Sequence, residues 1–144
     1  MAGTSEQSAA LARHIYEAFN RDDLHAAADV ATDDMEVELV PFGQTFRGRE
    51  GLLQCMGVFK TAFPDLQITV TNQVATDDQV VSECSWHGTH TGVLKSPLRD
   101  IASANKAVVG GRFCEVLRIR DGKVARLANY QDAASWLRQL GLVP

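Results

Sequence analysis

Two polar residues, Glu115 and Asn129, stand among apolar neighbours near the end of the sequence. Apolar and polar residues alternate around each of them, which is the period of strands with two unlike faces. A glutamate in apolar surroundings is a typical general base, and an asparagine amide both donates and accepts hydrogen bonds. The pair indicates either a pocket for a small molecule or, alternatively, a structural buried carboxylate that is satisfied by partners in the fold.

The turn between the two strands decides whether these side chains meet. A two-residue aspartate-glycine turn would bring Arg126 to the apolar face of the hairpin. A three-residue loop, with Gly122 as a left-handed bulge, matches the apolar residues across the strands and pairs Glu115 with Leu127. We favour this second register, which makes Glu115 and Asn129 diagonal neighbours, about 7–8 Å apart at the backbone, on one face.

The opposite face of the hairpin carries an apolar strip between arginines, formed by Cys114, Val116, Val124 and Ala128. Such a strip suits a subunit interface better than contact with water. We therefore expect a homo-oligomer that uses this face of the sheet.

The rest of the chain supplies helices first and hairpin-linked strands last, an order typical of an α+β domain. Apolar stripes at helical spacing predict helices over residues 8–19, 24–31 and 48–62, and a final helix that Asp132 caps. Alternation predicts strands over residues 35–39, 66–74 and 80–88, and residues 92–105 have the composition of a loop. The length of 144 residues fits one domain, residues 1–144.

Composition and charge argue against several classes of function. The net charge of −4 and the scattered arginines give no basic patch for nucleic acid. No apolar run approaches the roughly 18 residues of a membrane span, and the first residues lack the apolar centre of a signal peptide, so we expect a cytoplasmic protein. The three cysteines lack CxxC spacing and are expected to be reduced and buried.

No motif for a nucleotide, a flavin or a metal is present, and the four histidines lack ligand spacing on a shared face. We therefore expect neither a metal nor a bound cofactor. His90, in the glycine-flanked segment 88–92, is a candidate for the mouth of a pocket. Trp86, on the preceding strand, is either a core residue or a flat surface for a substrate.

Short segments along nearly the whole chain resemble the SnoaL-like polyketide cyclases, namely YEAFN at 16–20, AFPDL at 62–66, the segment 88–92, DGK at 121–123 and RQLG at 138–141. The resemblance implies a cone-shaped barrel, in which a curved, mostly antiparallel sheet wraps around helices. This fold is shared with scytalone dehydratase and nuclear transport factor two. The resemblance also implies that the family's catalytic histidine and aspartate positions fall on Glu115 and Asn129, and that a pocket tyrosine of some members falls on Phe19.

Because the chain departs from the histidine–aspartate pair, it is most similar to the AclR-type hydroxylase branch. That likeness implies cofactor-independent hydroxylation of an anthracycline-type aromatic polyketide, with a separate reductase as a partner. In this hypothesis Glu115 is the base and Asn129 holds a substrate oxygen. The residues expected to contact the substrate are Phe19, Trp86, His90, Phe113, Leu117 and Leu127. The alternatives are an intramolecular aldol cyclase with an altered acid–base pair and a non-catalytic protein that binds aromatic ligands.

Overall fold

A computed structural model describes residues 4–97 and 99–144, and a curved sheet of six strands is its main element. The strands follow the spatial order β2-β1-β6-β5-β4-β3. Strands β1 and β6 are parallel, and the other neighbouring strands are antiparallel. Their bounds are β1 (Ala31–Leu39), β2 (Gln44–Arg47), β3 (Gln67–Ala75), β4 (Gln79–Thr89), β5 (Ala107–Arg120) and β6 (Lys123–Gln131).

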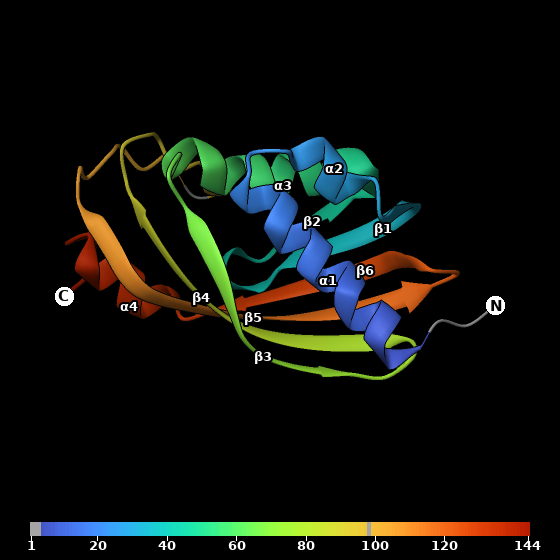
Figure 1. Ribbon diagram of the computed structural model, residues 1–144. Helices are drawn as coiled ribbons and strands as arrows, with labels where there is room; N and C mark the ends of the chain where they lie inside the picture. The colour runs from blue at the N-terminus through green and yellow to red at the C-terminus, as the bar shows by residue number, and fades with distance from the viewer. Residues whose placement is uncertain (1–3, 98) are drawn as a thin grey trace.

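The helices are α1 (Ser5–Asn20), α2 (Leu24–Ala28), α3 (Gly48–Ala62) and α4 (Ala133–Gln139), with a short 3-10 turn, η1 (Val40–Phe42). In Figure 1, α1 lies across the strands with α2 and α3 beside it, and α4 lies at the far end of the sheet near the C-terminus. This arrangement confirms the α+β cone expected from the sequence. No helix in the described segments is long and apolar enough to cross a membrane.

Helix α1 begins at a capping box and buries one face. The side chain of Thr4 accepts from the backbone of Gln7, and the side chain of Gln7 accepts from the backbone of Thr4. These bonds satisfy amide groups that the first turn leaves unpaired. Ile15, Tyr16 and Phe19 are buried at helical spacing. The cap and the stripe together direct this face toward the sheet.

The predicted helix over residues 48–62 and the cap at Asp132 are both confirmed: α3 spans Gly48–Ala62, and Asp132 accepts from the backbone of Ser135 at 3.3 Å. Near the start of the chain the prediction is less accurate. Helix α2 ends at Ala28, and β1 begins at Ala31 instead of residue 35. The short strand β2 was not predicted, because four residues give too few alternations to recognise.

The turn of the β5–β6 hairpin differs from the predicted three-residue loop. Asp121 and Gly122 both adopt left-handed backbone conformations, with φ of 52° and 73°. Arg120 and Lys123 are paired on either side of them, so the turn has two residues. A turn with two left-handed residues is favoured in hairpins because its twist matches that of the strands.

A bulge at Ala125 pairs the apolar residues of the two strands with one another. The three-residue loop had been predicted in order to produce this same pairing. The pairing shifts by one residue there, so that Arg118 pairs with Arg126 on the outer face. Glu115 consequently lies directly opposite Asn129 instead of diagonally. The predicted face is correct for Glu115, Asn129, Arg118 and Arg126, and the predicted register is wrong, because the extra residue lies in β6 and not in the turn.

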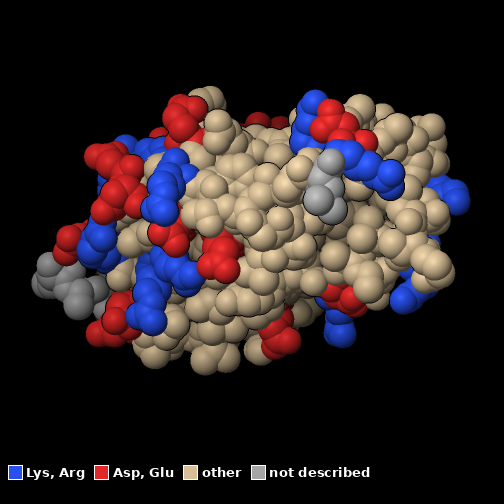
Figure 2. All heavy atoms as spheres, turned by 180° about the vertical axis from the view of Figure 1, so that it is seen from behind, with Lys and Arg blue, Asp and Glu red and all other residues tan. Residues whose placement is uncertain are grey.

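The bulge also changes the apolar strip predicted for the outer face. Val124 lies before Ala125, so it points inward and is fully buried in the core. Cys114 and Val116 remain partly exposed on the outer face. Seen from behind, the middle of the molecule carries few Lys, Arg, Asp or Glu side chains, which gather at the left and along the rim (Figure 2).

His90 holds the segment after β4 in place through packing and hydrogen bonds. Its ring is fully buried and stacks on Phe63, with ring centroids 5.2 Å apart. Its Nδ1 accepts from the backbone N–H of Ala104 at 3.0 Å, and its carbonyl accepts from Asn105 at 2.8 Å. Since Nδ1 is an acceptor, the proton of the neutral ring is on Nε2. Burial lowers the pKa of this histidine.

We therefore expect His90 to destabilise the protein below about pH 6.5, the ordinary histidine pKa. Below this pH the histidine is protonated in the unfolded chain, whereas the buried ring of the folded protein stays neutral. The free energy of unfolding therefore decreases as the pH falls toward the folded pKa. The free energy of unfolding should fall by up to about 1.4 kcal/mol per pH unit more in the wild type than in His90→Gln. Urea titrations of both proteins at pH 5 and pH 7 measure this, and identical pH dependence would exclude it.

Candidate active site

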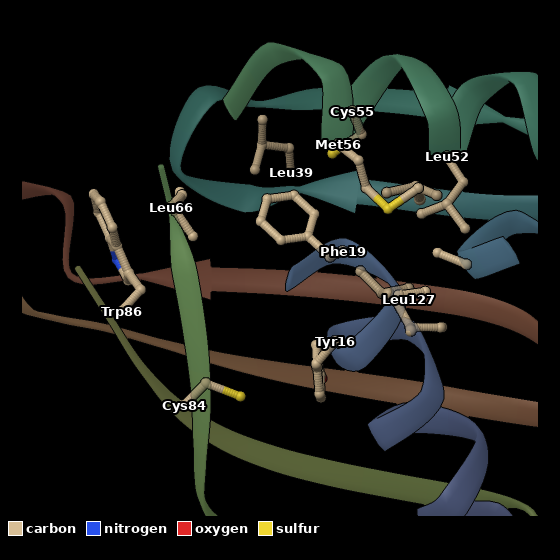
Figure 3. Packing of buried hydrophobic residues seen from close by; sticks show 14 of the residues in the cluster. Tyr16, Phe19, Leu39, Leu52, Cys55, Met56, Leu66, Cys84, Trp86 and Leu127 are labelled. Atoms are coloured by element: carbon tan, nitrogen blue, oxygen red, sulfur yellow. The ribbon is translucent and has the colours of Figure 1, made fainter. Parts of the chain in front are cut away.

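A cavity with an empty volume of about 660 Å³ lies between the inner face of the sheet and helices α1 and α3. This volume includes space open to solvent, and the part that a water-sized sphere can occupy is about 80 Å³. Its walls are almost entirely apolar, and Phe19, Met56 and Leu127 gather in this region from α1, α3 and β6 (Figure 3). The predicted site residues that line it are Phe19, Trp86, Phe113, Glu115, Leu127 and Asn129.

Glu115 is the one acidic residue in the described lining, and two neutral groups donate to it. The Tyr16 hydroxyl donates to Oε1 at 2.9 Å, and Asn129 Nδ2 donates to Oε2 at 2.8 Å. Glu115 and Asn129 are each 8% exposed. Both sequence interpretations are therefore correct in part, since the carboxylate is satisfied by the fold and also lines a pocket.

The electrostatics of the site favour a proton acceptor with an unusually high pKa. Burial raises the pKa of Glu115, and the hydrogen bonds from Asn129 and Tyr16 oppose this effect only partly. Burial, and then the charge of Glu115, raise the pKa of Tyr16 well above 10.0. Tyr16 therefore stays neutral and donates, while Glu115 is the group that can accept a proton.

Of the two polar atoms of the Asn129 amide, one is hydrogen-bonded within the described residues and the other is not. Its Nδ2 donates to Glu115, whereas its buried Oδ1 has no hydrogen-bond partner in the part of the chain that the structure describes. A buried unpaired acceptor typically costs about 1–3 kcal/mol. A half-turn of the amide would present this oxygen to Glu115 if that residue became a donor.

Tyr16 is the functional residue that sequence reasoning missed. It lies at the edge of the apolar stripe of α1, and the family's pocket tyrosine was matched to Phe19 instead. Both side chains line the cavity, but only Tyr16 contacts Glu115. A tyrosine beside the apolar stripe of a helix, with a hydroxyl that needs a partner when it is buried, was the available signal.

Aromatic rings form one end of the cavity. Trp86 is 6% exposed and packs edge-on against Phe63, with centroids 5.1 Å apart. Gly111 lies opposite Trp86, where a Cβ atom would be 2.4 Å from the indole nitrogen. Phe113 contacts Tyr16 edge-on at 6.2 Å. The missing side chain at Gly111 thus leaves room for the Trp86 indole, four residues along β5 from Glu115.

Two predicted contact residues lie elsewhere and require a correction. His90 is fully buried against Phe63 and does not line the cavity, because its ring holds the loop after β4. Leu117 is fully buried in the core and is likewise absent from the lining. Leu117 lies on the same inner face as Glu115, two residues further along β5. At that position neighbouring core side chains cover it.

The cysteines near the site are poor candidates for nucleophiles. Burial raises the pKa of both Cys55, which lines the cavity, and Cys84 to about 12. Their thiols are therefore protonated near neutral pH, whereas the thiolate is the reactive form. Within residues 4–97 and 99–144, no group of three His, Cys, Asp or Glu side chains comes together as metal ligands would.

Comparison with known proteins assigns the chain to a family. The model for SnoaL-like polyketide cyclases matches residues 9–140. The chain belongs to this family. No curated protein sequence matches significantly. That the family's catalytic histidine and aspartate positions fall on Glu115 and Asn129 stays a prediction from the sequence resemblance.

Several solved structures are similar to this chain in fold. IdmH from Streptomyces antibioticus, described as a candidate polyketide cyclase, is 26% identical, with a TM-score of 0.76 over 92% of this chain and 97% of that one. AclR from Streptomyces galilaeus, described as a candidate hydroxylase, is 24% identical, with a TM-score of 0.75 over 99% and 89%. A SnoaL-like protein from Jannaschia sp. CCS1 reaches a TM-score of 0.85 at 15% identity, over 100% and 98%.

Proposed function

We propose that the protein is a tailoring enzyme of aromatic polyketide biosynthesis that hydroxylates a polycyclic, anthracycline-type substrate without a bound cofactor. The observation that carries the proposal is a single carboxylate, Glu115, held at 2.9 and 2.8 Å by neutral donors in an apolar cavity. A base of raised pKa in such surroundings is suited to removing a proton from a weakly acidic phenol or dihydroquinone.

In the proposed reaction, the protein removes a proton and the substrate supplies both electrons. Glu115 takes the proton of a dihydroquinone, and the resulting anion passes one electron to molecular oxygen. The two radicals combine at a ring carbon, and Glu115 returns the proton to give a hydroperoxide. Cleavage of its O–O bond with loss of water leaves the hydroxyquinone, so that one oxygen atom enters the product and the other becomes water. An oxidised quinone has no electrons to give, so a separate reductase would have to deliver the reduced substrate. Asn129 would hold a phenolic or carbonyl oxygen, and Phe19, Trp86 and Phe113 would contact the flat rings.

The second candidate is an intramolecular aldol cyclase, which the family match and the likeness to IdmH favour. In that reaction Glu115 would remove a proton from carbon, and Tyr16, a neutral donor 2.9 Å away, would protonate the new alkoxide. The third candidate, a binding protein for aromatic ligands, would need the cavity but not the carboxylate.

Two incubations separate these functions. Oxygen uptake with a reduced anthraquinone, after treatment with a chelator and without added flavin, should follow enzyme concentration if the protein is a hydroxylase. Ring closure of a linear polyketide precursor without oxygen uptake would favour the cyclase. Saturable binding of the anthraquinone without either reaction would leave a ligand-binding protein as the remaining candidate. Loss of oxygen uptake on chelation would overturn the cofactor-free mechanism.

Asn129→Ala should weaken both ligand binding and turnover. The substitution removes a polar contact that the substrate would make in the ground state and in the transition state alike. It also removes the 2.8 Å bond to Glu115, which should raise the pKa of that carboxyl. We expect a loss of about two- to tenfold in affinity, since one such bond contributes about 0.5–1.5 kcal/mol. Fluorescence titration with the oxidised anthraquinone measures it, and unchanged affinity would remove Asn129 from the site.

A homo-oligomer that uses the outer face of the sheet stays a prediction. Cys114, Val116 and Tyr130, which is 47% exposed, leave an uncharged area on this face. Light scattering should give at least a dimer, and Val116→Lys should lower the mass because a charge in an apolar interface is costly. A monomer mass that is independent of concentration would contradict this prediction.

A further inference from the structure

Two carboxamide side chains, Asn129 and Gln131, line the cavity from β6. They are two residues apart on one strand, so they point to the same face, with their backbones about 6.5–7 Å apart. Among the other polar groups of this wall, Tyr16 donates to Glu115, and the indole nitrogen of Trp86 lies against the backbone of β5. The two amides, by contrast, each keep one end of the group for a ligand.

Glu115 fixes the orientation of the Asn129 amide. A carboxylate only accepts hydrogen bonds, so the amide atom 2.8 Å from Glu115 Oε2 has to be the nitrogen. The other end of the amide, Oδ1, is buried and has no hydrogen-bond partner among the residues that the structure describes. Asn129 is only 8% exposed. A buried acceptor of this kind in a cavity wall is complementary to a ligand group that donates.

Trp136 fixes the amide of Gln131 in the opposite sense. An indole nitrogen only donates, so the atom that it contacts at 3.2 Å has to be Gln131 Oε1. Trp136 is fully buried and packs edge-on against Phe63 and Trp86, which holds the indole in place. The remaining end of the amide is Nε2, and its two N–H groups make no hydrogen bond to any residue in 4–97 and 99–144. This amide therefore keeps a donor, where Asn129 keeps an acceptor.

We propose that Asn129 and Gln131 are specificity-determining residues, which select an aromatic ligand with a hydroxyl that donates to Asn129 Oδ1 and, along the same edge, a carbonyl that accepts from Gln131 Nε2. The inference rests on the proposed function and narrows its substrate class to hydroxylated aromatic ketones and quinones. The hydroxyl at Asn129 is not the one that Glu115 deprotonates, because an oxyanion would be repelled by Oδ1.

A purely structural role accounts for only half of each amide. It explains why Asn129 Nδ2 holds Glu115 and why Gln131 Oε1 holds Trp136. The free ends have opposite polarity, so a ligand in the reverse orientation would leave both of them without a partner. Sites that are built to hydrogen-bond a ligand reject analogues for this reason.

Three ligands with the same three-ring skeleton test this selection without turnover. The compound 2-hydroxyanthraquinone has both groups, anthraquinone lacks the hydroxyl, and 2-hydroxyanthracene lacks the carbonyls. Fluorescence titration with the hydroxyl neutral gives the Kd of each. Gln131→Met, which has a similar length and no N–H, should weaken binding of the two quinones about two- to tenfold and leave that of 2-hydroxyanthracene unchanged. Asn129→Ala should remove the preference for 2-hydroxyanthraquinone over anthraquinone.

Two further variants separate the donor of Gln131 from its packing. Trp136→Phe keeps a ring but removes the N–H that orients Gln131, so its loss in quinone affinity should lie between zero and that of Gln131→Met. Gln131→Glu keeps the bond to Trp136 and replaces the donor by an acceptor, so it should weaken quinone binding more than Gln131→Met. Gln54→Met, on the exposed face of α3 and outside the lining, is the matched control and should bind all three ligands as the wild type does.

The outcomes distinguish this inference from the proposed function. In Gln131→Met, an unchanged affinity for the quinones, or an equal loss for all three ligands, would overturn the inference. Selective binding in a protein that shows no oxygen uptake with a reduced anthraquinone would support the inference and refute the hydroxylase. Oxygen uptake without any selection among the ligands would do the reverse, and no saturable binding of any ligand would overturn both.

Discussion

Glu115→Gln should lower turnover about 10²–10⁴-fold, the usual contribution of a well-placed general base, while the affinity for an aromatic ligand changes little. Glutamine keeps the shape of the side chain and removes only its ability to accept a proton. Tyr16 can still donate to the amide oxygen. Asn129 can turn by half a rotation and present its unpaired Oδ1 to the new N–H donor. Binding and geometry are therefore preserved, so that the measurement isolates proton transfer.

The same variant should be at least as stable as the wild type. The folded pKa of Glu115 is raised by burial, so its contribution to stability is fully present below the unfolded pKa of about 4.3 and is lost as pH rises through the folded pKa. The advantage of Glu115→Gln in thermal midpoint should consequently be larger at pH 7 than at pH 4.

Oxygen uptake with a reduced anthraquinone measures the catalytic loss. Glu83→Gln is the matched control, because Glu83 lies on the neighbouring strand β4, is exposed and bonds to Asn72 at 2.8 Å. It should retain the wild-type rate. Equal rates in Glu115→Gln and the wild type would remove Glu115 from the mechanism. A loss of both turnover and ligand binding would indicate that the carboxylate serves recognition instead.

Trp136→Ala should give the largest loss of stability, about 3–5 kcal/mol, or roughly 10–20 °C in the thermal midpoint. Trp136 of α4 is 0% exposed and packs edge-on against both Phe63 and Trp86 at 6.1 Å. Its indole nitrogen also donates to Gln131 Oε1 at 3.2 Å. The substitution removes the support for Trp86 and releases Gln131, and both of these residues line the cavity.

Urea unfolding and ligand titration measure the two effects of this change. Trp136→Phe keeps a ring against Phe63 and should lose less than half as much stability. Leu142→Ala, at a position 38% exposed in the C-terminal segment, is a control for unrelated effects and should stay within about 0.5 kcal/mol of the wild type. A loss below about 1 kcal/mol for Trp136→Ala would show that α4 is not essential to the core.

The sequence by itself determined which face of the β5–β6 hairpin points inward, except at Val124, which the bulge at Ala125 turns toward the core. Alternation places Glu115 and Asn129 on the apolar side of the hairpin, because the side-chain period of a strand is two and depends on neighbouring residues only. The helix over residues 48–62 was recognisable for a similar reason. Its stripe repeats over several turns, and Pro64 stands two residues after its end.

The distances within the site were decided by tertiary structure. The bulge at Ala125 sets the Glu115–Asn129 register, and β6 around it is also held by parallel pairing with β1, a strand far away in the sequence. Tyr16 reaches Glu115 because α1 crosses the sheet at that position, and His90 turns inward to hold a loop. Local patterns report which side of an element is apolar. They do not report where two elements cross, since that depends on how all the side chains of the core pack together.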